Sequence, residues 1–185
     1  MKSLSSSALS FDQFQEIVSS IYDAALEPDL WGNVLEKIAT TLKAEQAYMR
    51  TINTESNDIQ LFYSYNKDPS WLQAYKDYYI HRDPWLNGVL KSKRTYIACT
   101  HHLITDKEYE AMEYHRDLVT PQGIHYGVGG KIILEKNIAS YLAFNRDKKR
   151  MGFEDEYLET LQLLVPHIQK ALLITEKTRH IDLKQ

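Results

Sequence analysis

Two pairs of strand-like segments constrain the fold more than any other feature of this sequence. The first pair covers 46–53 and 58–66, and the second covers 124–134 and 138–145. In each pair a short polar turn joins runs rich in β-branched and aromatic residues, which is typical of a hairpin. Helical patterns precede, separate and follow the hairpins. The sequence therefore predicts an α+β fold, an α-β-α sandwich around a central antiparallel sheet, rather than a doubly wound parallel sheet.

Apolar periodicity and start signals mark the helices around these hairpins. Apolar residues at helical spacing predict one helix over 11–26 and a second over 30–42. An Asp-Pro pair opens each of two further helices, at 68–80 and 83–90, because Asp caps free N–H groups and Pro fits the first turn. A Thr-Asp pair opens the next helix, at 105–120.

The last helix carries an apolar stripe with steps of three and four residues, between 158 and 175. This spacing is that of a coiled-coil seam, and it is equally that of a helix packed on a sheet. The sequence thus predicts a long C-terminal helix, kinked at Pro166, and leaves both interpretations of its stripe open. For the first interpretation, a homodimer, the predicted dimerisation residues are Leu158, Leu161, Val165, Ile168 and Leu172.

Charge and cysteine content narrow the possible functions. The 22 Lys and Arg residues and 25 Asp and Glu residues give a net charge of −3, which excludes general adhesion to nucleic acid or an anionic membrane. The single cysteine, Cys99, excludes an internal disulfide and indicates a reducing compartment. No apolar stretch is long enough to span a bilayer. We expect a cytoplasmic protein with one domain at 11–180, a flexible N-terminus at 1–10, and a tail or linker at 181–185.

Catalytic motifs are missing from the sequence. There is neither a phosphate-binding glycine loop nor a nucleophile elbow. The glycines within 127–130 lie in a strand-like run, where they indicate a bulge or a close approach of backbone. Cys99, His101 and His102 contain metal-ligand atoms, but three donors so close in sequence rarely reach one tetrahedral ion. We predict no enzyme activity, no catalytic residues, no metal and no cofactor.

An aromatic cluster with a nearby carboxylate marks the candidate binding site. Trp71 and Tyr75 lie four residues apart, on one face of a helix. Such a face against a sheet can wall an apolar pocket, and Asp83 just beyond it could accept a hydrogen bond from a ligand. Two plainer interpretations stay open: the aromatic residues fill a core, and Asp83 only caps the next helix. The candidate ligand-binding site also includes Trp85 and Tyr63.

Four stretches of the chain resemble a known family. The pattern Trp-x3-Tyr-x7-Asp-Pro at 71–84 resembles that of the autoinducer-binding domains of LuxR-type transcription regulators. The segment 122–127 is similar to the Gly-Ile-x-x-Gly stretch that opens the later strands of that family. The segments 21–31 and 164–172, the latter with a Pro-His-Ile run, are similar to LuxR-type regulators with PAS- or GAF-like sensor domains. Together the matches span about 21–173.

This resemblance implies a PAS/GAF-like sensor domain, usually dimeric, that acts on DNA through a helix–turn–helix domain absent from this chain. It implies that Trp71 donates to a ligand carbonyl, Asp83 accepts from a ligand amide and Tyr75 lines the cavity. Lactone receptors of the family carry Tyr four residues before the Trp, where this chain has Lys67. The resemblance therefore covers the architecture and not lactone specificity.

Two functions follow from these observations. The first is a ligand-sensing regulatory domain of a LuxR-type transcription regulator, active in quorum sensing, whose partner is a small molecule. The alternative is a dimerisation or protein-binding module whose core is filled and which takes no ligand. A cavity beside the aromatic cluster would favour the first.

Overall fold

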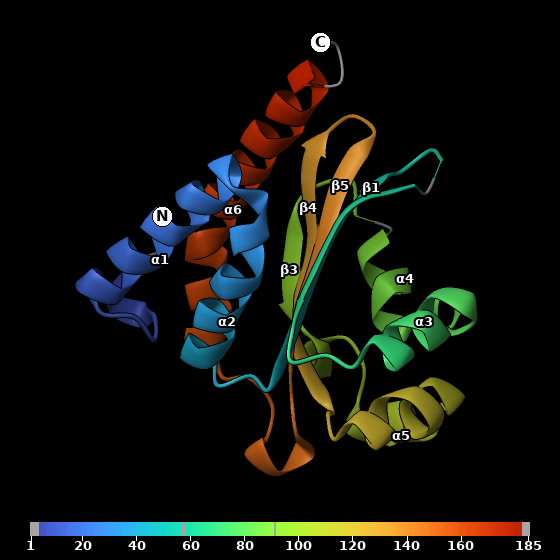
Figure 1. Ribbon diagram of the computed structural model, residues 1–185. Helices are drawn as coiled ribbons and strands as arrows, with labels where there is room; N and C mark the ends of the chain where they lie inside the picture. The colour runs from blue at the N-terminus through green and yellow to red at the C-terminus, as the bar shows by residue number, and fades with distance from the viewer. Residues whose placement is uncertain (1–3, 57, 91, 183–185) are drawn as a thin grey trace.

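The computed structural model describes residues 4–56, 58–90 and 92–182, which form a five-stranded antiparallel sheet between two layers of helices (Figure 1). The order across the sheet is β2-β1-β5-β4-β3. Both predicted hairpins form, and the predicted α-β-α sandwich is confirmed. The strands are β1 (Gln46–Asn53), β2 (Ile59–Tyr65), β3 (Tyr96–Cys99), β4 (Tyr126–Glu135) and β5 (Ile138–Arg146).

Helices α1, α2 and α6 cover one face of the sheet, and the shorter α3, α4 and α5 lie on the other (Figure 1). Ser10, Asp68 and Thr105 cap α1, α3 and α5 by accepting hydrogen bonds from backbone N–H groups of the first turn. The bounds are α1 (Phe11–Leu26), α2 (Trp31–Thr41), α3 (Pro69–Asp77), α4 (Pro84–Leu90), α5 (Asp106–Glu110) and α6 (Asp155–Asp182).

Three segments differ most from the prediction. The helix α3 stops at Asp77, and a 3-10 turn follows at Tyr79–His81. The predicted helix over 105–120 divides into α5 and a π-helical stretch, Tyr114–Val119. The strand β3 was not predicted, because four residues at the edge of a sheet are too few to show an alternating pattern.

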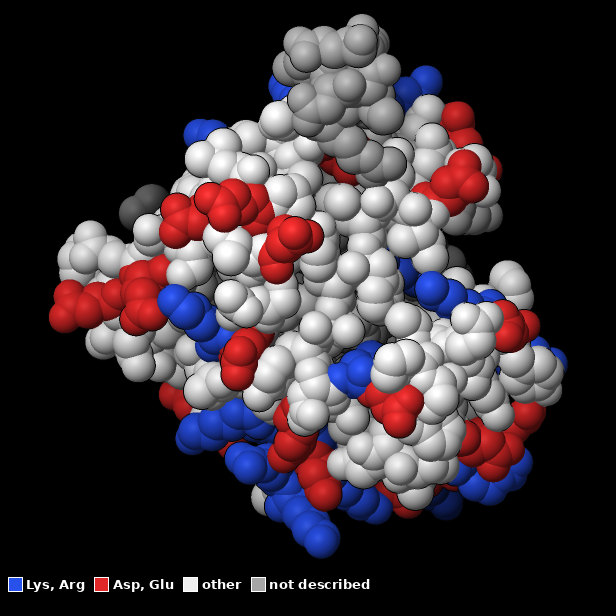
Figure 2. All heavy atoms as spheres, viewed as in Figure 1, with Lys and Arg blue, Asp and Glu red and all other residues white. Residues whose placement is uncertain are grey.

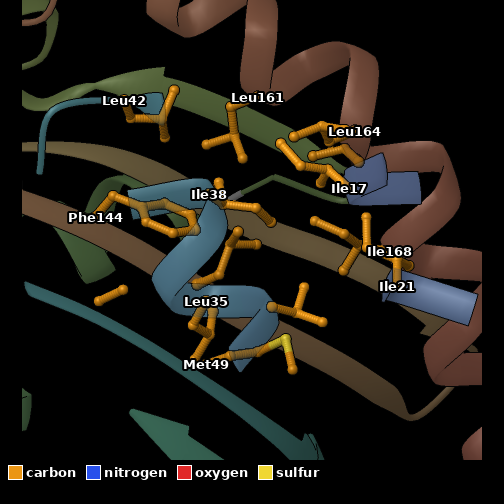
Figure 3. Close-up of a cluster of buried hydrophobic side chains, with 14 of the residues drawn as sticks. Ile17, Ile21, Leu35, Ile38, Leu42, Met49, Phe144, Leu161, Leu164 and Ile168 are labelled. Atoms are coloured by element: carbon orange, nitrogen blue, oxygen red, sulfur yellow. The ribbon is translucent and has the colours of Figure 1, made fainter. Parts of the chain in front are cut away.

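The main hydrophobic core lies between the sheet and the layer formed by α1, α2 and α6. Figure 3 shows side chains of these helices pointing toward one another and toward the strands, with Ile21, Ile38 and Leu161 among them. All three side chains are fully buried, as is Phe144 from β5. Because this core joins the ends of the chain to its central strands, it holds the domain together.

The apolar stripe of α6 packs into this core rather than outward. Leu161, Val165, Ile168 and Leu172 are all buried within the chain, and Leu158 is partly buried against the same cluster. The helix continues without a break through Pro166. The stripe thus packs the helix on the sheet, which was the plainer of its two interpretations. Within one chain these side chains pack mainly on the core, and a contribution of the stripe to a dimer stays a prediction.

The start of the chain is also packed more closely than predicted. Leu9 is buried, and the backbone N–H of Ala8 donates to Thr160 Oγ1 on α6 at 2.8 Å. Ala8 and Leu9 therefore pack against the folded domain, and the flexibility expected of 1–10 stays a prediction. Of the predicted tail at 181–185, positions 183–185 lie outside the described residues. Within the described ranges, no helix is both long and apolar enough to cross a membrane.

The glycines of β4 make the close backbone approach that their position predicts. A Cβ atom built on Gly129 would lie 2.1 Å from the carbonyl oxygen of Leu142 in the neighbouring strand. Such a distance is far inside van der Waals contact, and the nearest atoms are backbone atoms that no rotamer change can move. A side chain at this position would push β4 away from β5.

We expect Gly129→Ala to lower the free energy of unfolding by about 3 kcal/mol, because the added methyl group overpacks the centre of the sheet. The matched control is Gly32→Ala in α2, where a Cβ would meet nothing within 4 Å. There the helix propensity of Ala should add up to about 1 kcal/mol. Urea unfolding followed by circular dichroism measures both, and equal effects would contradict this account of Gly129.

Candidate ligand-binding site

A cavity lies on the α3 and α4 side of the sheet, opposite the main core. Its empty space is about 650 Å³, counted out to its open mouth. Aromatic and aliphatic side chains form most of its walls, and Arg50, Lys67, Lys76, Gln122 and Asn145 contribute polar groups. This combination is typical of small-molecule sites, in which apolar walls bind the body of the ligand and a few polar groups orient it. The aromatic lining residues are Tyr48, Phe62, Trp71, Tyr75, Trp85 and Tyr114.

A second cavity, with about 480 Å³ of empty space counted in the same way, adjoins the first. Tyr48, Trp85 and Ala143 line both cavities, so these residues separate them. Asp83 lies in the second cavity, whereas Trp71 and Tyr75 line the first. The residues of the predicted site are thus brought together, but on two sides of one partition.

The alternation of β1 and β5 builds the floor of both cavities. Successive side chains of a strand point to opposite faces of the sheet. On β1, Tyr48 and Arg50 therefore line the cavity while Met49 enters the main core. On β5, Ala143 faces the cavity and its neighbour Leu142 packs in the main core.

Asp83 is a buried carboxylate with three hydrogen bonds inside the chain. Its Oδ1 accepts from the backbone N–H groups of Trp85 at 2.9 Å and Leu86 at 3.0 Å. Its Oδ2 accepts from the hydroxyl of Tyr75 at 2.9 Å. Burial raises the pKa of Asp83, against the opposing effect of these hydrogen bonds. The capping interpretation is therefore confirmed, and a direct ligand contact of Asp83 stays a prediction.

The three predicted aromatic residues of α3 and α4 line the first cavity. Tyr75 is buried, and its loss of solvent raises the pKa of its hydroxyl. Trp85 is partly buried and packs on Tyr109 with 5.0 Å between ring centroids. The indole N–H of Trp85 is buried and has no hydrogen-bond partner among the described residues. Trp71 is partly buried on the same wall.

Tyr63 does not belong to this site. It packs against the main core, on the opposite face of the sheet from the cavity. Its neighbour Phe62 lines the cavity instead, because adjacent residues of β2 point to opposite faces. The prediction was wrong by one residue, since the pattern of β2 contains large apolar side chains on both faces and does not fix which face is which.

Two basic residues of the cavity were not predicted as site residues. Arg50 is only 5% exposed, and its guanidinium carbon lies 5.6 Å from the centroid of the Tyr75 ring. Lys67 donates from Nζ to Gln122 Oε1 at 3.1 Å, and burial lowers the pKa of its ammonium group to about 8. The signal for Arg50 is a charged residue at a cavity-facing position of a central strand, two positions from Tyr48.

Cys99, His101 and His102 lie closer together than their spacing led us to expect. Their ligand atoms lie within 4.8 Å of one another. Burial raises the pKa of the Cys99 thiol to about 12, and the thiol points to the carbonyl oxygen of Phe153 at 3.7 Å. Metal binding needs the thiolate, which this environment disfavours.

The surface carries charges of both signs. Figure 2 shows acidic side chains over the α1 and α2 side of this face and basic side chains mixed with acidic ones along its lower edge. A protein that grips a nucleic-acid backbone usually concentrates Lys and Arg on one face. We therefore take the concave cavity, rather than the charged surface seen in Figure 2, as the candidate binding site.

Comparisons with known proteins identify the fold. No family model and no curated protein matches the chain. Among solved structures, the ligand-binding domain (LBD) of VqsR from Pseudomonas aeruginosa matches with a TM-score of 0.69 and 13% identity, over 89% of this chain and 96% of that chain. A solution structure of SdiA from Escherichia coli matches with a TM-score of 0.61 and 18% identity, over 89% and 97%.

A third structure, CepR2 from Burkholderia cenocepacia, is an N-acylhomoserine-lactone-dependent LuxR-family transcription factor. It matches with a TM-score of 0.60 and 15% identity, over 85% of this chain and 91% of that chain. A phycoerythrobilin-bound GAF domain of a cyanobacterial phytochrome matches with a TM-score of 0.59 and 10% identity, over 93% and 100%. The chain therefore has the fold that LuxR-type autoinducer-binding domains share with GAF domains, as predicted.

We expect Asp83→Ala to lower the free energy of unfolding by about 2 kcal/mol or more, because it removes a helix cap and leaves the buried Tyr75 hydroxyl without its acceptor. Asp83→Asn keeps one side-chain oxygen, which can still accept some of these hydrogen bonds, and should lower the free energy of unfolding by less. Thermal unfolding of the two variants tests the assignment. Equal and negligible effects would show that these hydrogen bonds contribute little.

Lys67 should destabilise the fold near neutral pH. The pKa of its ammonium group falls from 10.5 to about 8 on folding. The fold therefore has its full stability above pH 10.5, loses stability as the pH falls from 10.5 to 8, and bears the whole penalty below pH 8. We expect Lys67→Met to raise the free energy of unfolding at pH 7 by about 1 kcal/mol, less than a fully buried lysine would give, and by much less at pH 10. Urea unfolding at both pH values measures this, with the exposed Lys107→Met as the control. A gain that does not depend on pH would contradict the assignment.

Proposed function

We propose that this chain is the ligand-sensing domain of a LuxR-type transcription regulator. The observation that carries the proposal is the aromatic cavity between α3, α4 and the sheet, with Trp71, Tyr75 and Asp83 beside it. A filled core would have no such cavity, so this observation favours a sensor over a ligand-free dimerisation module. Solved structures of the same fold include an LBD and a lactone-dependent regulator, which supports the same function.

The ligand would be bound by three side chains with different roles, those of Trp71, Tyr75 and Asp83. Trp71 forms an aromatic wall and can offer its indole N–H to a ligand carbonyl. Tyr75 lines the cavity and orients Asp83 through their hydrogen bond. A carboxylate has about four acceptor positions, and three are used here, so Asp83 keeps one for a ligand N–H. Trp85 contributes the partition between the two cavities.

The ligand would be a small amphiphile. SdiA has been solved in complex with octanoyl-rac-glycerol, which combines an acyl chain with a polar head. The mostly apolar lining of the first cavity, with polar groups at a few places, suits the same general class.

Ligand binding would act on the regulator by shifting the populations of its dimer arrangements. A ligand that binds one arrangement of a homodimer better shifts the equilibrium toward that arrangement. DNA would be contacted by a separate helix–turn–helix domain, in the cytoplasm. The chain spans 62% of the length of one SdiA chain that it matches. Since most of the α6 stripe is buried, the proposed dimer would depend largely on residues beside the stripe.

Ligand-induced thermal stabilisation tests the sensor proposal. The panel is N-octanoyl-homoserine lactone, octanoyl glycerol and octanoate, each at 1 mM. At a concentration one hundred times its Kd, a ligand stabilises the fold by about 2.7 kcal/mol, so at least one compound should raise Tm by several degrees. Trp71→Ala should remove this response and stay folded by circular dichroism.

The control for this experiment is Phe11→Ala, which truncates a side chain that is 61% exposed on α1, away from the cavity. It should leave the response unchanged. The sensor proposal is contradicted if the wild-type chain responds to no member of the panel, or if Trp71→Ala responds as strongly as the wild type.

A further inference from the structure

The side chain of Arg50 is buried and has neither an ion-pair partner nor a hydrogen-bond acceptor among the described residues. Among the described residues, no carboxylate lies within the 4.0 Å of an ion pair, and no side chain or backbone group accepts a hydrogen bond from it. Its Nε is buried. Its contacts are the faces of two aromatic rings, Tyr75 and Tyr141, at 5.6 and 5.3 Å. Cation–π contact offsets part of the cost of burying this charge and satisfies none of its N–H donors.

A second N–H donor on the cavity wall also lacks a partner among the described residues. This donor is the indole N–H of Trp85, which is buried and cannot accept a hydrogen bond. The one carboxylate in this region, Asp83, already accepts three hydrogen bonds. Arg50 and Trp85 together therefore offer N–H donors to an occupant that brings lone pairs.

A second cation lies on the wall of the same cavity. Lys67 is partly buried, with its ammonium group 5.6 Å from the Tyr48 ring centroid, and no described carboxylate forms an ion pair with it. With the exposed Lys76, Arg50 and Lys67 thus place three positive charges on the cavity wall against the single negative charge of Asp83 beyond the partition. The cavity is electropositive although the whole chain carries a net charge of −3.

We infer that the ligand is an organic anion, whose carboxylate or similar oxyanion binds Arg50, assisted by Lys67, while its apolar body lies against Trp71 and Tyr75. This inference rests on the proposed function and narrows its ligand class. The planar guanidinium matches a carboxylate through parallel N–H···O bonds, and the low dielectric of a buried site strengthens them. A neutral head group leaves the buried cation unpaired and is therefore rejected.

Carboxylates and their primary amides form the sharpest test, because each pair differs in charge and hardly in shape. We would use octanoate with octanamide and indole-3-acetate with indole-3-acetamide, on the whole 185-residue chain at pH 7. Titration calorimetry gives Kd, and thermal unfolding gives the stabilisation. We expect the carboxylate of at least one pair to bind at least tenfold more tightly than its amide.

Variants connect this preference to the two cations. Arg50→Gln should weaken carboxylate binding at least tenfold and bring it level with that of the amide. Lys67→Gln should weaken it several-fold, and it serves as the second variant if Arg50→Gln does not fold. The matched control is Lys107→Gln, which removes one exposed positive charge at the start of α5 and should leave Kd unchanged.

Each outcome decides between the two proposals. Amides that bind as well as carboxylates, or an Arg50→Gln variant that keeps the preference, overturn the anion assignment. A response to octanoyl-homoserine lactone or octanoyl glycerol with none to any carboxylate also overturns it, while the sensor proposal stands. If no compound, charged or neutral, binds or raises Tm, both proposals are overturned.

Discussion

The central strands β1 and β5 contribute side chains to the main core on one face and to the cavity on the other, and most of the structure depends on this constraint. Each strand sends alternate side chains to opposite faces, so Met49 enters the main core while Tyr48 and Arg50 line the cavity. A shift of one residue in pairing would exchange the two sets. The burial of Met49 and its neighbours against α1, α2 and α6 therefore fixes the floor of the binding site.

The architecture could be predicted because its signals are local. Polar turns between apolar runs identify the two hairpins, and Asp68 and Asp83 with the prolines after them mark where α3 and α4 begin. The strand β3 gave no such signal in four residues. The apolar stripe of α6 could not be assigned to a dimer or to a core from sequence, because both require the same spacing; only the position of α1 and the sheet decides it.

The site was predictable where its residues share one helix and not where it depends on the sheet. Trp71 and Tyr75 lie on one helical face, and their spacing alone brings them to the same wall. Tyr63 and Phe62 exchange roles according to which face of β2 meets the cavity, and the sequence carries no mark of that. The role of Arg50 could not be predicted, because an arginine in a strand is normally expected at the surface and its burial depends on the surrounding elements.

The separation of the main core from the cavity by a single sheet has a consequence for how such a chain can change during evolution. Residues such as Phe62 and Lys67 can be replaced on one side of the sheet without disturbing the packing of Ile38 or Leu161 on the other. Mutations at distant sites with no shared contacts usually have additive effects on stability. New ligand preferences can therefore accumulate on the α3 and α4 side while the helix layer that ends in α6 keeps its shape.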